Sequence, residues 1–215
     1  MSEKRISFHG RAPGRAPLPE PQLGEPHTIF LLSPANLAGI RGKRLLQGSS
    51  RFELSLRLQS SQATLGEIFS FVSGLYFRGK LAYASQFARP PIGMSGVRII
   101  TSSSGLLPPE YPASLDWLRA MTVSSIDPDN PQYRDPLIRD AQLICSALPR
   151  GARVVLLGSV ATPKYVAPLL EVFGQRLFYP LDFVGRGDMS RGSLLLRCTR
   201  ENRELSYAAL GPVRT

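Results

Sequence analysis

The segment at residues 185–192 combines residue types that bind phosphate groups. It contains three glycines together with Arg186, Asp188, Ser190 and Arg191. Arginine can contact a phosphate through two N–H donors, and glycine lets the backbone approach a ligand closely. Asp188 is well placed to act as an acid or a base. The alternative is an Asp–Arg pair that simply ties the loop down.

Three further polar segments each follow an apolar run that we expect to be a buried strand. They occupy residues 33–36, 102–105 and 158–162 and supply the candidate ligand contacts Ser33, Asn36, Ser104, Gly105, Gly158 and Ser159. In an open parallel sheet, ligands bind at the carboxyl ends of the strands. Gly158 and Ser159 also precede a predicted helix, whose first N–H groups favour an anion. Ordinary turns without a ligand are the alternative for each segment.

The charge of the chain favours an anionic partner. The formal net charge is +10, and the first 26 residues hold four basic and three acidic groups, so most of the excess lies beyond them. A basic folded surface suits nucleic acid, nucleotides or other phosphates. The competing explanation is a compositional bias, since 22 arginines accompany four lysines.

Several classes of protein are disfavoured. Two cysteines and two histidines provide neither a disulfide framework nor a zinc cluster, so we expect no metal and no cofactor. No apolar run reaches about 18 residues, and the N-terminus lacks an apolar targeting segment, so we expect a cytoplasmic protein of bacterial type, without a membrane partner. The G-x-S-x-G, G-x-G-x-x-G and G-x-x-x-x-G-K-[ST] motifs are absent. Whether the chain is an enzyme stays open.

The pattern along the chain predicts an α/β fold with a mostly parallel central sheet, flanking helices and a C-terminal antiparallel hairpin. Proline, glycine and arginine in residues 1–26 predict a disordered tail, and residues 27–215 form one α/β domain. Strands are expected at residues 27–32, 52–58, 97–101, 153–157 and 177–179, and the hairpin at 193–199 and 204–208.

Helix signals separate these strands. A basic helix is expected near residues 39–44, and Thr64 is expected to cap a helical stretch that ends before Pro90. Asp135 and Pro136 are expected to begin another helix as its N-cap and first residue. Thr162 and Pro163 are expected to begin the next one, and residues 182–192 are expected to form a loop.

Several segments together resemble the peroxide-stress YaaA-like family and its smaller relatives of unknown function. They comprise residues 31–35 (LLSPA), 73–76 (SGLY), 104–108 (SGLLP), 154–157 with Lys164 and Tyr165, and 186–191 (RGDMSR), in the family's order. The resemblance implies an α/β DNA-binding protein of the bacterial cytoplasm that limits oxidative damage. This chain is shorter than that family.

A second similarity is to uracil-DNA-glycosylase-like proteins, in which a late apolar strand also runs into Gly-Ser and a helix. Residues 154–159 match this pattern, but the His-Pro-Ser segment of those enzymes is absent. The missing histidine argues against the glycosylase mechanism, so the similarity leaves a pocket of different chemistry that takes up a flipped-out base.

Three hypotheses follow. The first is a protein that binds DNA or another phosphate-bearing ligand through the Gly/Arg loop and the strand-end serines. The second is an enzyme that acts on a nucleotide or nucleobase, with Asp188 as acid or base. The third is an interaction module whose arginines meet an acidic protein partner. The sequence does not indicate an oligomeric state.

Overall fold

The central feature of the protein is a six-stranded sheet with the order β4-β3-β1-β6-β7-β8. The computed structural model describes residues 25–211, so the predicted tail at residues 1–26 lies outside them apart from Glu25 and Pro26. The four inner strands are parallel, and both edge strands run antiparallel to their neighbours. The strands are β1 (Thr28–Leu32), β3 (Val97–Ile100), β4 (Leu106–Leu107), β6 (Arg153–Leu157), β7 (Leu177–Pro180) and β8 (Tyr207–Ala209).

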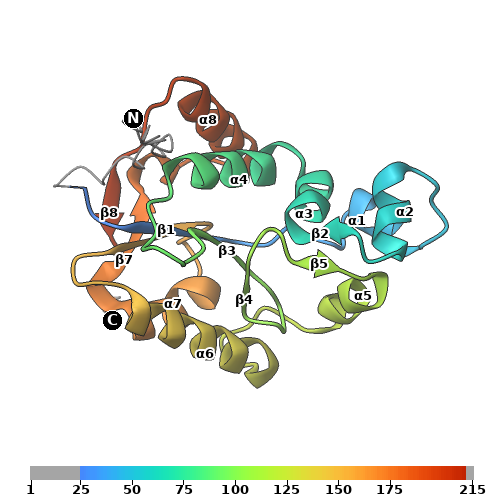
Figure 1. Cartoon of the computed structure of the whole chain (residues 1–215), viewed down its shortest axis with the longest axis horizontal. Coiled ribbons are helices and arrows are strands. Elements are labelled where there is room, and N and C mark those ends of the chain that lie inside the picture. The colour runs from blue at the N-terminus through green and yellow to red at the C-terminus, as the bar shows by residue number, and fades with distance from the viewer. Residues whose placement is uncertain (1–24, 212–215) are drawn as a thin grey trace, which may run out of the picture.

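Helices cover both faces of this sheet, which confirms the predicted fold class (Figure 1). One face carries α4 (Leu75–Phe87) and α8 (Asp188–Arg200), and the other carries α6 (Pro131–Ala147) and α7 (Pro163–Phe173). Strand β1 is buried on both sides because its side chains alternate between two apolar clusters: Phe30 and Leu32 face α4, while Ile29 and Leu31 face α6 and α7.

Shorter elements gather at one end of the sheet (Figure 1). They are α1 (Ile40–Leu46), α2 (Glu53–Gln59), α3 (Leu65–Ser73), α5 (Leu115–Val123) and the two-stranded sheet of β2 (Ala63–Thr64) and β5 (Pro112–Ala113). Two 3₁₀ turns, η1 (Gly174–Arg176) and η2 (Leu181–Phe183), flank β7. As predicted, Thr64 caps α3. It forms a capping box in which its hydroxyl accepts from the Glu67 N–H while the Glu67 carboxylate accepts from the Thr64 N–H.

Helices α4 and α8 cross at two glycines. A Cβ atom at Gly79 would lie 2.7 Å from the Gly192 carbonyl oxygen, and a Cβ atom at Gly192 would lie 2.8 Å from the Tyr76 Cα atom. Both contacts are with backbone, which cannot move aside as a flexible side chain can. Gly192 therefore serves the approach of two helices, and this close crossing fixes where α8 begins relative to the sheet.

The segment at residues 52–58 is a helix, α2, and the predicted strand is wrong. Its apolar residues recur every second position, but Leu54 and Leu58 are also four apart, as one face of a helix requires. Leu58 is buried and Leu54 packs against the core, whereas Leu56 is 51% exposed. The alternation of apolar and polar residues therefore also placed two leucines on one face of a helix.

The predicted strand at residues 193–199 is also wrong, because these residues belong to α8. Leu194, Leu195 and Cys198 are buried, and all three face α4 from one side of the helix. The predicted loop at 182–192 is accordingly shorter: Asp182 and Phe183 belong to η2, and the loop ends at Gly187, before α8. The expected C-terminal antiparallel pair exists, but it joins β7 to β8, with Tyr179 opposite Ala208.

Helix α6 begins earlier than predicted, at Pro131 with Asn130 as its N-cap. The Asp135–Pro136 pair lies inside the helix, so its assignment as the helix start is wrong. The same type of signal occurs at Asn130–Pro131, where the Asn130 side chain accepts from the Gln132 N–H. The additional turn buries Tyr133, whose hydroxyl donates to the Lys164 carbonyl at 2.8 Å.

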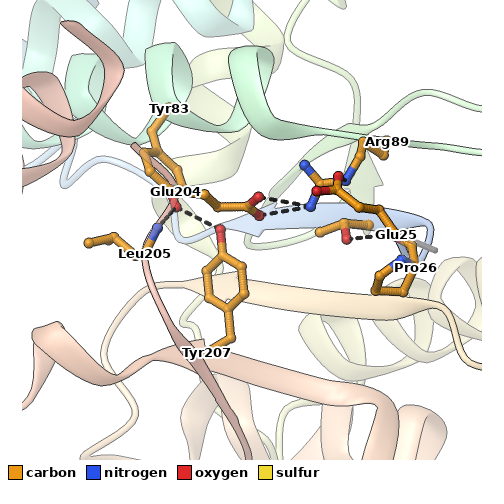
Figure 2. A network of polar contacts seen from close by, with 8 residues as sticks. Glu25, Pro26, Tyr83, Arg89, Glu204, Leu205 and Tyr207 are labelled. Atoms are coloured by element: carbon orange, nitrogen blue, oxygen red, sulfur yellow. Dashed lines mark hydrogen bonds and ion pairs between the residues drawn. The ribbon is translucent and has the colours of Figure 1, made fainter. Parts of the chain in front are cut away.

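A polar brace of four side chains ties the C-terminal segment to α4 (Figure 2). It consists of Tyr83, Arg89, Glu204 and Tyr207. The Tyr83 and Tyr207 hydroxyls are 2.7 Å apart, and Tyr83 Oη accepts from the Leu205 N–H at 2.7 Å. Arg89 donates to both carboxylate oxygens of Glu204, at 3.0 and 2.8 Å. Burial raises the pKa of Tyr83 to about 12, so this hydroxyl stays protonated at neutral pH.

Candidate functional site

A pocket of about 800 Å³ lies at the carboxyl ends of β1, β3 and β6. The chain passes from β1 to β3 on one side and then returns to β6 on the other, so the sheet order reverses at β1. A crevice is expected where connections leave neighbouring strands in opposite directions. The topology of the sheet therefore places the pocket here.

The structure brings four of the predicted site residues to this pocket. Ser33 and Asn36 follow β1, and Ser159 follows β6. Asp188 is the first residue of α8 and precedes Gly192, where this helix crosses α4. The Asp188 side chain is 71% exposed, so water still reaches the carboxylate. A carboxylate and strand-end serines from distant parts of the sequence thus line the same pocket.

Gly158 contributes to the pocket through packing. A Cβ atom there would lie 3.0 Å from the Ser33 Cβ atom, so the glycine allows the loop after β6 to lie against the end of β1. Ser33 is held from the same side, because its N–H and its hydroxyl both donate to the Leu157 carbonyl, at 3.2 and 3.3 Å. Gly158 therefore fixes the position of Ser33.

Ser104 and Gly105 lie outside this pocket. Ser104 lines a smaller depression together with Arg98 and Asp140, and Gly105 lies beside Asp140. The Ser104 hydroxyl accepts from the Trp117 indole N–H at 3.2 Å. Gly105 has a φ of +69°, and a Cβ atom there would collide with the Asp140 carboxylate. The residue that the β3 loop places in the main pocket is Ser102.

The arginines of the Gly/Arg segment do not line the pocket. Arg191 donates twice to the Phe183 carbonyl, at 3.1 and 2.9 Å, and its guanidinium lies 5.3 Å from the centre of the Phe183 ring. Arg186 donates to the Ser190 hydroxyl at 3.2 Å on the exposed surface. Arg191 Nη1 also lies 3.8 Å from Asp188 Oδ1, so the Asp–Arg pair that was the structural alternative for this segment is present.

Lys80, which was not among the candidate site residues predicted from the sequence, lies directly behind Ser33. Its side chain is 1% exposed, and Nζ donates to the Ser33 carbonyl at 2.5 Å and to the Ser33 hydroxyl at 2.8 Å. The amine also sits 4.6 Å from the centre of the Tyr76 ring and 4.9 Å from that of Phe77. Burial lowers the pKa of Lys80 to about 7, against a smaller opposing attraction from Asp188.

Two more lysines, Lys43 from α1 and Lys164 from α7, line the pocket itself. Apart from Lys4, these two and Lys80 are all the lysines of a chain that contains 22 arginines. The scarcity of lysine was visible in the sequence and could have pointed to these positions. A compositional bias toward arginine gives no reason for the remaining lysines to gather at one place.

The rest of the lining offers neutral donors. Tyr76 and Tyr165 face the pocket, and burial raises the pKa of each to about 12, so both hydroxyls remain protonated. Tyr76 Oη is buried and has no hydrogen-bond partner among the described residues, so it meets a ligand only if the side chain turns toward the pocket. Ser73, Ser102, Thr122 and Ser124 add hydroxyls around the rim. Such a surface can bind a ligand rich in oxygen atoms.

Comparisons with protein-family models, with curated proteins and with solved structures found no match. Within residues 25–211 no group of three or more histidine, cysteine, aspartate or glutamate side chains is arranged to hold a metal ion. No helix in that part of the chain is long and apolar enough to cross a membrane.

Proposed function

We propose that this protein binds a phosphate-bearing ligand of nucleotide size in the pocket at the carboxyl ends of β1, β3 and β6. The observation that carries the proposal is the convergence of Lys43 and Lys164 on a polar pocket of about 800 Å³. That volume lies in the range of about 300–1,000 Å³ that small-molecule sites occupy. Two cations face one carboxylate, Asp188, so the pocket favours an anion.

The backbone supports the same ligand. Helices α7 and α8 both start at the pocket, since Lys164 and Tyr165 lie in the first turn of one and Asp188 begins the other. The first N–H groups of a helix carry partial positive charge and bind phosphate oxygens. Hydroxyl groups around the rim suit a sugar. A bacterial stress role and a link to the YaaA-like family remain part of this proposal through the resemblance alone.

Calorimetric titration of the full chain with nucleoside mono- and diphosphates tests the proposal. We expect Lys164→Ala to weaken binding about tenfold, because the lost charge-assisted contact is worth about 1.5 kcal/mol. Arg150→Ala removes an exposed positive charge just before β6, at the amino end of this strand and so at the end of the sheet opposite the pocket, and is the matched control. If the Lys164→Ala protein binds the nucleotide as tightly as the wild type does, the ligand does not bind in this pocket and the proposal is wrong.

A titration with short duplex DNA separates this pocket from the DNA-binding surface that the basic charge suggested. Binding of DNA through exposed arginines depends steeply on salt and weakens on substitution of Arg186. Binding of a nucleotide in the pocket depends on Lys43 and Lys164 instead. Salt-dependent binding of DNA without any nucleotide binding would favour the surface over the pocket.

A further inference from the structure

The floor of the pocket pairs a hydroxyl with an amine. Lys80 Nζ lies 2.8 Å from Ser33 Oγ, and Ser33 lines the pocket while Lys80 lies behind it. Ser33 is 7% exposed and Lys80 is 1% exposed. A bound molecule therefore meets the serine first, and the amine acts on it only through that serine.

We propose that Ser33 is a nucleophile and Lys80 its general base, and that this pair transfers an acyl group from a substrate that carries a phosphate or carboxylate. The inference that the substrate is anionic rests on the proposed function, since Lys43 and Lys164 would bind the anionic group. The assignment of the nucleophile and the base rests on the Ser33–Lys80 contact alone. Serine–lysine pairs are an established variant of serine–histidine catalysis.

The surroundings of Lys80 favour the neutral amine that a base requires. The groups that face it are the Ser33 hydroxyl and carbonyl, just after β1, and the rings of Tyr76 and Phe77 on its own helix. Behind these, α3 packs Phe69 against Phe77, and β3 turns Val97 and Ile99 to the same cluster. From α8, the charged group that acts on Lys80 is Asp188, which raises its pKa less than burial lowers it.

An arginine could not perform this role, because its guanidinium stays protonated at any physiological pH. A purely structural role for Lys80, as a donor to the carbonyl at the end of β1, is a costly use of a buried amine. An apolar residue of similar volume is usually at least as stable at such a position. The chain nevertheless places one of its four lysines there.

The Ser33 hydroxyl donates to the Leu157 carbonyl at 3.3 Å, so the proposed step begins when this O–H turns to the neutral Lys80 Nζ, 2.8 Å from Oγ. Lys80 Nζ then removes the proton while Oγ forms a bond to the substrate carbonyl carbon. The bond from that carbon to the leaving oxygen or sulfur then breaks, and the leaving group takes a proton from solvent water in the pocket, because Lys80 is reached only through Ser33. The resulting hydroxide attacks the acyl-serine, and Lys80 returns its proton to Ser33 Oγ as the bond from Oγ to the acyl carbon breaks. Asn36 lines the same pocket, and we assign it as the donor to the oxyanion. Its Oδ1 accepts from the Ala38 N–H at 3.0 Å, and its Nδ2 has no partner among the described residues.

Labelling with an alkyl fluorophosphonate tests the pair without knowledge of the substrate. Ser33 Oγ would form a bond to phosphorus as the P–F bond breaks and fluoride leaves. We expect a single adduct, which peptide mass spectrometry locates at Ser33. Its rate should rise with pH and level off above about 7, where Lys80 is neutral. Ser33→Ala should abolish the adduct, and Ser193→Ala, on the exposed side of α8, should leave the rate unchanged.

Lys80→Met should slow labelling about 100-fold, the lower end of the contribution of a general base. Circular dichroism would show that this variant folds. If it does not fold, the pH profile of the wild type carries the test. No adduct at Ser33 at neutral to alkaline pH, a pH-independent rate, or an unchanged rate in Lys80→Met would each overturn the proposal.

The nucleotide titration fails or succeeds separately. Labelling of Ser33 in a protein that binds no nucleotide supports the pair and removes the phosphate ligand. Nucleotide binding without labelling of Ser33 retains the ligand and overturns the pair.

Discussion

Helix α4 carries two buried polar clusters that differ in how completely their groups are matched. Lys80 and Tyr83 lie three residues apart and so point to one side of the helix. Tyr83 belongs to the polar brace, in which hydroxyl, amide and ion pair meet partners within the protein (Figure 2). Among the described residues, the Lys80 amine donates hydrogen bonds to Ser33 alone, and Ser33 opens onto the pocket.

The difference indicates what each cluster is for. Polar groups that meet partners within the protein cost little to bury and fix one arrangement of the chain. A buried amine with a lowered pKa beside a pocket is typical of functional sites, because desolvation tunes its affinity for a proton. The brace should therefore contribute stability, and the Ser33–Lys80 pair should lower it in exchange for chemistry.

The largest expected effect comes from Gly192→Val, which acts on both clusters through the crossing of α4 and α8. A Cβ atom at this position would lie 2.8 Å from the Tyr76 backbone, so the helices must separate. Overpacking of this kind costs about 3 kcal/mol. Urea unfolding measures the loss, and Ser193→Ala at the next, exposed position is the control. An unchanged midpoint would show that the crossing tolerates a side chain.

A smaller loss is expected from Tyr83→Phe, which removes one hydroxyl from the brace. The Leu205 N–H then loses its acceptor and Tyr207 loses its neighbour, and unsatisfied buried groups cost about 2 kcal/mol. Labelling of Ser33 should continue at the wild-type rate. A loss of labelling with little loss of stability would reverse the roles assigned to the two clusters.

The smallest change, and one of opposite sign, is expected from Lys80→Met. In the wild type, unfolding raises the pKa of Lys80 from about 7 toward 10.5, so the unfolded state binds more protons between these values and stability rises with pH. At about pH 6 the native protein carries the buried charge, and its removal should stabilise by about 1 kcal/mol after the lost hydrogen bonds.

Thermal unfolding of wild type and Lys80→Met at several pH values measures this effect. The advantage of the variant should shrink as the pH rises from about 7 to about 10, where the native amine is already neutral. A constant difference in melting temperature across that interval would mean that the Lys80 pKa is not lowered by folding.

Local signals predicted the elements that depend on neighbours in the sequence. The buried runs at β1, β3 and β6, the capping box at Thr64 and the start of α7 at Pro163 all appear as expected. The errors have local causes too. Leucines at every second position in residues 52–58 fit both a strand and a helix, and packing against the core decided for the helix. Likewise, α6 starts at Asn130–Pro131 because burial of Tyr133 favours one more turn.

The sequence by itself determined an α/β sheet, a basic composition and the polar residues that leave the strand ends, because strand burial and capping depend on short-range pattern. It also contained the scarcity of lysine. Only the tertiary structure decided that Lys80, 47 positions after Ser33, lies behind its hydroxyl, and that Arg191 turns inward to the Phe183 carbonyl. Such contacts follow from the glycine crossing of α4 and α8 and from the sheet order, and neither is encoded in any single segment.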